Sequence, residues 1–124
     1  MQVVSIIIQI VLALLFLMAG AGKAAGSNMH VENFKQWRLP QWFRVVTGLV
    51  ELVGAAALVI GIWEPSWAAA GALWLGITSI GGIWVHIRAR DTFKQSFMIV
   101  LLFILCAVVF FIQLGELANF PGFQ

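Results

Sequence analysis

Four apolar stretches, each about as long as a bilayer is thick, dominate this chain of 124 residues. A helix needs about 20 mostly apolar residues to cross a hydrocarbon core of about 30 Å. Helices are expected because open strands would leave unpaired backbone groups in lipid. The sequence therefore predicts a single all-α domain, a four-transmembrane-helix bundle. Its predicted spans are residues 3–22, 45–63, 67–85 and 97–117.

Lipid is the expected solvent for most of these side chains. The chain is 62% apolar and 10% charged, whereas an average soluble domain carries roughly a quarter charged residues. A soluble fold of this size could not bury so much apolar surface, because small folds leave much of their surface exposed. The small net charge of +2 and the lack of a basic stripe give no indication of nucleic-acid binding. The lipid bilayer is therefore the first expected partner.

Two features refine the predicted first half of the chain. Val31, Phe34 and Trp37 recur at helical spacing, and the pattern stops at Pro40. We therefore expect a short interfacial helix between spans one and two. A cleaved signal peptide is the alternative interpretation of residues 3–22. Retention is favoured, because no Lys or Arg precedes the run and it is longer than a usual signal core.

The basic residues predict an orientation. All seven lie in or beside the first and third connections, which share one side of a four-span bundle: Lys23, Lys35, Arg38, Arg44, Arg88, Arg90 and Lys94. Connections rich in Lys and Arg stay in the cytoplasm. We therefore expect both connections to be cytoplasmic and both termini to lie outside, in a bacterial inner (plasma) membrane.

One acidic residue, Glu51, lies well inside a predicted span. A charged side chain at the bilayer centre costs about 2.5–3.5 kcal/mol on insertion scales and usually faces a partner in the bundle. Arg44 and Thr47 share its helix face, and Lys23 and His86 end spans on the same side of the membrane. These five residues are the candidate ligand-binding site. Two interpretations stay open: a small inward-facing cavity, or an ion pair from Glu51 to Lys23 or Arg44 that fixes helix packing.

The other polar residues of the spans favour structural roles. Gln9 and Gln113 lie toward the outer side and are expected to hydrogen-bond to each other across helices. Thr78 and Ser79 can bond back to carbonyls of their own helix. Cys106 is the one cysteine, so an internal disulfide is excluded. No metal-ligand spacing or phosphate-binding loop is found, and no catalytic residue is predicted.

Three segments resemble the DoxX-like family of small membrane proteins. Residues 12–26, LALLFLMAGAGKAAG, resemble the end of that family's first helix, with small residues followed by a lysine. Residues 39–61, LPQWFRVVTGLVELVGAAALVIG, resemble its second helix, with a proline-led entry and a glutamate before a Gly-Ala run. Residues 67–91 resemble a third helix that closes with a histidine. A departure is Ala24, where many relatives have leucine.

The resemblance implies a compact four-helix membrane protein in which Lys23, Glu51 and His86 are the matched polar positions. Some relatives are linked to quinone-dependent sulfur oxidation or oxidative-stress complexes, and a distant animal branch assists receptor assembly. The leading hypothesis is a non-catalytic protein that binds a lipid or quinone-like ligand or supports a membrane redox partner. A quinone is the one cofactor that the resemblance suggests.

Other functions are weighed against this one. A small proton-coupled transporter using Glu51 is the alternative; the span that holds Glu51 and the one-sided charge distribution count against it. A catalytic quinone oxidoreductase subunit would need a redox cofactor or thiol pair, and neither has visible ligands. If the chain belongs to an oxidoreductase, we expect it to be an accessory membrane subunit. Ligand, partner and homo-oligomeric state are left open by the sequence.

Overall fold

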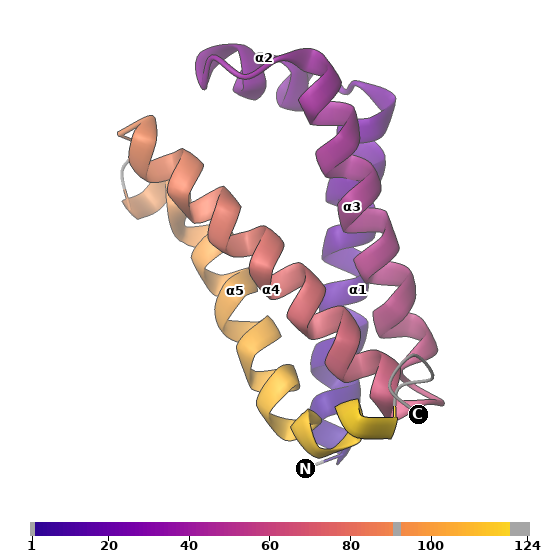
Figure 1. Cartoon of the computed structure of the whole chain (residues 1–124). Helices are drawn as coiled ribbons and strands as arrows, with labels where there is room; N and C mark the ends of the chain where they lie inside the picture. The colour runs from indigo at the N-terminus through magenta and orange to yellow at the C-terminus, as the bar shows by residue number, and fades with distance from the viewer. Residues whose placement is uncertain (1, 91–92, 120–124) are drawn as a thin grey trace.

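The computed structural model describes residues 2–90 and 93–119, and within these ranges the chain is helical, with no strand. Five α-helices are followed by a short 3-10 helix, η1 (Figure 1). Their bounds are α1 Gln2–Ala25, α2 Asn28–Gln36, α3 Gln41–Ile60, α4 Pro65–Arg88, α5 Phe93–Ile112 and η1 Leu114–Asn119. The predicted all-α class is confirmed.

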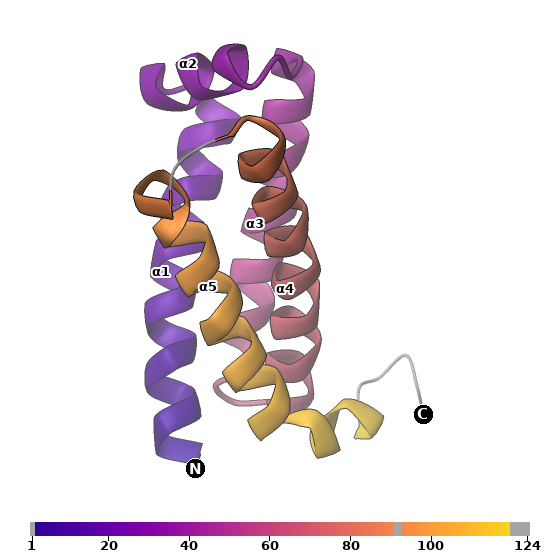
Figure 2. The same cartoon turned by 90° about the vertical axis from the view of Figure 1, so that its left-hand side faces the viewer.

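The long helices form two pairs that diverge toward one end of the molecule. α1 packs along α3 and α4 packs along α5, while α2 lies across the end at which the pairs are furthest apart (Figures 1 and 2). The buried residues of α4 all fall between Ser66 and Ser79, and none lies in its last turns. The helix pairs therefore meet closely only over the half of the bundle remote from α2.

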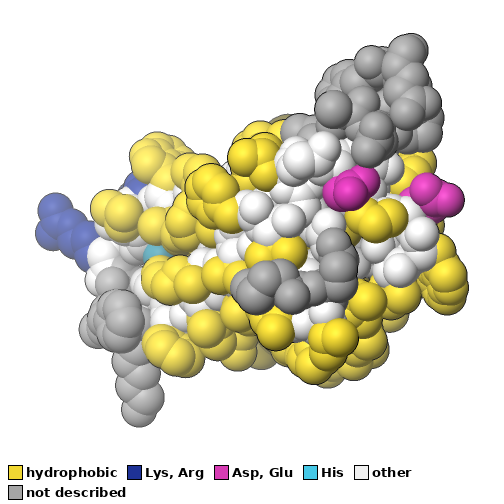
Figure 3. Space-filling model, turned by 90° about the horizontal axis from the view of Figure 1, so that it is seen from below, with side chains coloured by type: hydrophobic (Ala, Val, Ile, Leu, Met, Phe, Trp, Pro, Cys, Tyr) yellow, Lys and Arg dark blue, Asp and Glu magenta, His cyan; other side chains and the backbone are white. Residues whose placement is uncertain are grey.

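Three of the described helices are long and apolar enough to cross a membrane: α1, α3 and α4. The described apolar part of α5, Ser96–Ile112, is shorter. Many large apolar side chains point outward, among them Ile7, Met18 and Ile77. Seen from below, hydrophobic side chains cover much of the visible face (Figure 3). So much exposed apolar surface is typical of a protein solvated by lipid.

The helix predicted in the first connection is present as α2. A Schellman turn ends it: the Arg38 N–H donates to the Lys35 carbonyl, and the Leu39 N–H donates to the Phe34 carbonyl. Arg38 occupies the left-handed position of this turn, with φ of 59°. Pro40 then prevents the helix from continuing, as the sequence predicts.

Several predicted boundaries differ from the observed helices. α1 continues beyond residue 22 and ends at Ala25, before Gly26 with φ of 79°. α3 begins at Gln41, because the helix starts directly after Pro40 and not where the apolar run starts. α5 ends at Ile112, whereas the predicted span runs to residue 117, because the chain tightens there into η1. Hydropathy measures apolar length, whereas local backbone signals decide where a helix ends.

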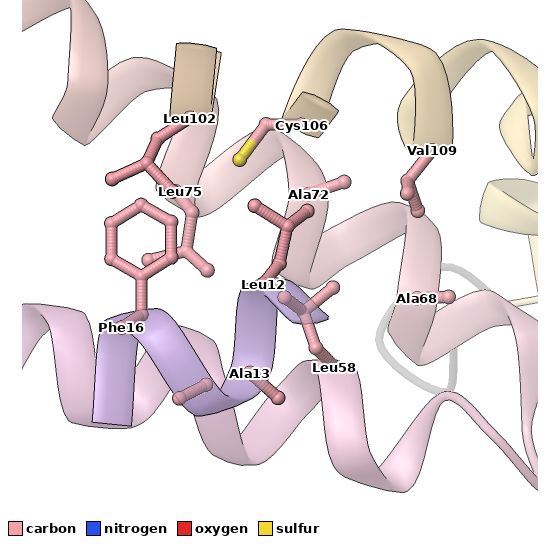
Figure 4. Close-up of a cluster of buried hydrophobic side chains, with 11 residues drawn as sticks. Leu12, Ala13, Phe16, Leu58, Ala68, Ala72, Leu75, Leu102, Cys106 and Val109 are labelled. Carbon is pink, nitrogen blue, oxygen red and sulfur yellow. The ribbon is translucent and has the colours of Figure 1, made fainter. Parts of the chain in front are cut away.

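A cluster of buried apolar side chains holds α1, α3, α4 and α5 together (Figure 4). Phe16, Leu58 and Leu75 are its large members, and Cys106 packs among them with its side chain fully buried. Small residues let α3 and α4 approach: a Cβ atom added to Gly54 would lie 2.4 Å from the Leu75 side chain. The Trp74 indole also donates to the Val50 carbonyl at 2.9 Å.

A buried polar relay lies at the end of the bundle opposite α2. The Gln113 amide donates to the Ser5 hydroxyl at 3.1 Å, and Ser5 donates to the Gln9 side chain at 2.7 Å. The predicted direct bond between the two glutamines is therefore wrong, because Ser5 stands between them. The Gln9 amide instead donates to the Leu58 carbonyl at 3.3 Å, so the relay links α1 to α3 and to the end of α5.

Candidate functional site

An ion pair between Lys23 and Glu51 joins α1 to α3 inside the bundle. Lys23 Nζ lies 2.5 Å from Glu51 Oε1, and the exposed fractions of the two side chains are 17% and 4%. A buried carboxylate needs such a partner, because its charge loses the hydration that water would provide. The sequence offered Lys23 or Arg44 as the partner of Glu51, and the structure has Lys23.

Two glycines allow this contact. A Cβ atom added to Gly48 would lie 2.7 Å from the Gly20 carbonyl oxygen and 3.0 Å from the Lys23 Cβ atom. Real Cβ atoms do not approach backbone so closely, so only glycine permits this crossing of α1 and α3. Lys23 and Glu51 each follow their glycine by three residues and therefore lie on the same helix face as it does.

Arg44 has a different role from the one that the sequence suggested. Its Nη1 donates to the Lys23 backbone carbonyl, and its Nε donates to the Gln41 side-chain oxygen at 2.8 Å. Lys23 lies in the last turn of α1, where carbonyl groups have no partner within the helix. Arg44 therefore satisfies the end of α1 from α3, and it holds the Lys23 backbone in place without lining the pocket described next.

A pocket of about 540 Å³ lies beside the ion pair, between α3 and the C-terminal half of α4. The residues that line it lie toward the end of the bundle that carries α2. The helix pairs diverge toward this same end (Figure 1). Its wall is mainly apolar, and four predicted site residues line it: Lys23, Thr47, Glu51 and His86. The structure thus brings these four together, although they come from three helices.

Thr47 and His86 line the same pocket as the ion pair and have contacts of their own. The Thr47 hydroxyl donates to the Phe43 carbonyl of its own helix at 2.8 Å, which leaves its oxygen able to accept a bond. The His86 ring packs edge-on against the Trp37 indole, with ring centroids 5.1 Å apart. His86 therefore helps to join the end of α4 to the segment that follows α2.

The aromatic part of the pocket was missed by sequence reasoning. Phe34, Trp37, Phe43 and Trp84 all line the cavity, and Phe34 packs against both Trp37 and Phe43. The pattern of Phe34 and Trp37 at helical spacing was visible, but it indicated only a helix with an apolar face. That this face covers a cavity depends on where α2 docks, which periodicity does not specify.

His30 on α2 lies behind the ion pair. A Cβ atom added to Gly22 would meet the His30 ring at 2.9 Å, so the ring packs directly on the end of α1. Burial lowers the pKa of His30 below its ordinary value, and the positive charges of Lys23 and Arg44 lower it further. His30 therefore stays neutral at pH 7, which avoids a third positive charge beside Lys23 and Arg44.

Within the part of the chain that the structure describes, no group of three His, Cys, Asp or Glu side chains is placed to hold a metal ion. Apolar spanning helices around a pocket with one ion pair are features of an integral membrane protein with a ligand-sized cavity. The chain belongs to the DoxX-like family, whose profile matches residues 7–109. The resemblance drawn from the sequence is confirmed.

A Bacillus subtilis (strain 168) protein described as the uncharacterized protein YdgD is similar to this chain. It is 31% identical over 107 residues, which cover 86% of this chain and 90% of that protein. No solved structure gives a significant match. The similarity therefore supports membership of the family along most of the chain, and no activity is assigned to that relative.

Proposed function

We propose that this DoxX-like protein binds a lipid or quinone-like ligand in the pocket between α3 and α4, and that it does so without catalysing a reaction. The observation that carries the proposal is the Lys23–Glu51 pair on the wall of a mainly apolar cavity of about 540 Å³. Small-molecule sites are typically about 300–1,000 Å³, apolar, and supplied with a few fixed polar groups.

The chemistry of the wall suits an amphiphile with a small polar head. The Lys23 ammonium has three N–H donors, and one of them contacts Glu51. A ligand carbonyl or hydroxyl oxygen could accept another, while Glu51 accepts from a ligand hydroxyl. The aromatic side chains Phe34, Phe43 and Trp84 offer flat surfaces for a ring or an acyl chain. A quinone would provide both the carbonyl oxygens and the ring.

The membrane arrangement that we propose has four crossings. α5 has 20 residues, which corresponds to about 30 Å of helix and to the thickness of the hydrocarbon core. α2 would then lie in the cytoplasmic interface, with both termini outside, in a bacterial inner membrane. Cysteine-free variants that carry one new cysteine at the exposed Glu64 or at the exposed Lys35 test this arrangement. An impermeant thiol reagent should label the first in intact cells and the second only in lysed cells.

Native mass spectrometry of the purified chain tests the ligand. We expect a co-purifying lipid or quinone on the unchanged protein, and about tenfold less of it on Glu51→Gln, which corresponds to the loss of one charge-assisted hydrogen bond. Glu64→Gln is the matched control, because it removes an exposed carboxylate distant from the pocket. If Glu51→Gln lowers thermal stability and leaves ligand retention unchanged, the pair only fixes helix packing.

Support of a membrane redox partner is the second part of the proposal, and delivery of the bound ligand to that partner would link ligand binding to this support.

The alternative is a small proton-coupled transporter that uses Glu51. Its carboxylate is already paired with Lys23 at 2.5 Å, which opposes an exchange between a proton and a cation. Proton flux driven by a substrate in liposomes, abolished by Glu51→Gln, would favour transport over binding.

A further inference from the structure

Three arginines converge at the end of the molecule that carries α2. Arg38 lies just after the end of α2. Arg88 is the last residue of α4, and Arg90 lies two residues beyond it. Together with Gln36, Trp37 and Ala89 they line a second pocket of about 340 Å³, which adjoins the pocket beside Glu51 and shares Trp37 and Arg88 with it. Among the residues that the structure describes, no acidic side chain lines this pocket and no ion pair joins any of these arginines to a carboxylate.

Arg38 and Arg90 occupy backbone positions that favour glycine. Their φ angles are 59° and 58°, and each is the left-handed residue that closes a helix. Side chains other than glycine and asparagine are disfavoured there by about 1–2 kcal/mol, because Cβ crowds the carbonyl oxygen. Placing arginine at both positions therefore costs stability, and such strain points to a role for the side chain.

The charge at this site exceeds what the helix ends require. Two helix C-termini present together about one unit of negative partial charge. Three guanidinium groups carry three positive charges and Asp91, the residue that follows Arg90 in the sequence, carries one negative charge, so an excess of about one remains. Compensation of the helix dipoles alone does not account for the cluster.

Arg88 is held in place before any ligand binds. Its Nη2 donates to the Trp37 backbone carbonyl at 3.2 Å, and its guanidinium lies 5.6 Å from the centre of the Trp84 ring. Tryptophan side chains favour the boundary between headgroups and hydrocarbon. We therefore expect the cluster to lie at the depth of lipid phosphate groups.

We propose that Arg38, Arg88 and Arg90 bind the phosphate group of an anionic phospholipid. Guanidinium groups form paired hydrogen bonds with phosphate oxygens, which a lysine cannot match in geometry. This site adjoins the ligand pocket and shares Trp37 and Arg88 with it, whereas Arg38 and Arg90 line the second pocket alone. The proposal holds whichever face of the membrane α2 lies on. A free phosphate ion offers the same chemistry, but it lacks the acyl chains that would lie along Trp84 and the exposed Ile87 of α4.

Native mass spectrometry of the delipidated full chain in a non-ionic detergent tests this proposal. An equimolar mixture of phosphatidylglycerol and phosphatidylcholine is added, and the ratio of the two bound lipids is measured. The unchanged chain should favour phosphatidylglycerol. Arg38→Gln and Arg90→Gln should each lower the ratio about fivefold, the effect of one basic residue near an anionic surface. Lys35→Gln is the matched control, because it removes an exposed charge of α2 outside the pocket.

Three outcomes would overturn the proposal. The first is a loss with Lys35→Gln as large as with Arg38→Gln, which would indicate unspecific attraction to the basic end. The second is displacement of the lipid by millimolar inorganic phosphate, which would assign the site to the free ion. The third is an unchanged ratio in the Arg38→Gln/Arg90→Gln double variant. Melting temperatures measured on the same samples show whether each variant is folded.

Discussion

The Lys23 ammonium and the Glu51 carboxylate meet at 2.5 Å beside the point where α1 and α3 cross. The crossing is close because Gly20 and Gly48 face each other there. The polar pair therefore depends on a backbone contact as well as on its own charges. Changes at the glycines and changes at the charged residues should affect the site in different ways.

Gly48→Ala should separate α1 from α3. The new methyl group would lie 2.7 Å from two backbone atoms, the Gly20 oxygen and the Ala24 nitrogen. Neither atom can give way without moving a helix, so a loss of about 1–3 kcal/mol in unfolding free energy is expected. Unfolding by SDS in mixed micelles measures it. Gly81→Ala is the control: nothing lies within 4 Å of that position, and helix propensity alone should keep or raise stability.

Lys23→Met should destabilise the bundle by about 3 kcal/mol, because it leaves the buried Glu51 carboxylate without its ammonium partner. Glu51→Leu alone should cost less, since Lys23 is more exposed and can reach water. The Lys23→Met/Glu51→Leu double variant should recover most of the loss, as apolar replacements of a buried pair often do. The same unfolding measurement completes the cycle. Additive single effects would show that the pair contributes no coupling energy.

Ser5→Ala should break the polar relay at the end opposite α2. The change removes the acceptor of Gln113 and the donor to Gln9, and hydrogen bonds between membrane helices contribute about 0.6 kcal/mol on average. A loss of about 1 kcal/mol is expected. Ser79→Ala is a matched control, since Ser79 is equally buried but donates to Leu75 of its own helix. An equal loss in both variants would contradict a specific role for Ser5.

Arg38→Gly should raise stability and weaken phospholipid binding at the same time. Glycine adopts φ of 59° without crowding, so an increase of about 1 kcal/mol in unfolding free energy is expected. The lost guanidinium should reduce the preference for phosphatidylglycerol as in Arg38→Gln. Unfolding in mixed micelles and lipid retention are measured on one preparation. Stability that falls with Arg38→Gly would mean that the arginine side chain also stabilises the fold.

Acidification should destabilise the protein through His30. Its folded-state pKa is lowered by burial and by Lys23 and Arg44, whereas the unfolded chain titrates near the ordinary value of about 6.5. Below that pH the unfolded state binds more protons, so stability falls as pH decreases. Melting temperatures from pH 7.5 to about pH 5 check this. His30→Gln should show a smaller decrease, and parallel curves for the two proteins would contradict the assignment.

The sequence predicted most of the helical architecture, because the lengths of the apolar stretches and the positions of the polar residues and prolines between them follow simple physical rules. α2 was expected from Val31, Phe34 and Trp37, and its end from Pro40. The grouping of Lys23, Glu51 and His86 was also expected, because span ends on one side of a membrane must lie near one another. These predictions use only periodicity, charge and the thickness of a bilayer.

Other features depend on contacts that sequence patterns do not encode. Arg44 was expected beside Glu51 because both lie on one helix face, but its long side chain reaches the free carbonyl of Lys23 instead. Ser5 was not singled out, since a lone serine in an apolar run commonly bonds to its own helix. The divergence of the helix pairs follows from small residues in one half of the α3–α4 contact, such as Gly54.

The position of Cys106 allows opening of the helix bundle to be measured on the protein without any substitution. It is the only cysteine in the chain, and its side chain is completely enclosed among residues of four helices. A fluorogenic maleimide can reach the sulfur only when those helices part, so the labelling rate measures how often the whole core opens. Thiol labelling can therefore measure the rate of bundle opening in lipid without the introduction of a new cysteine.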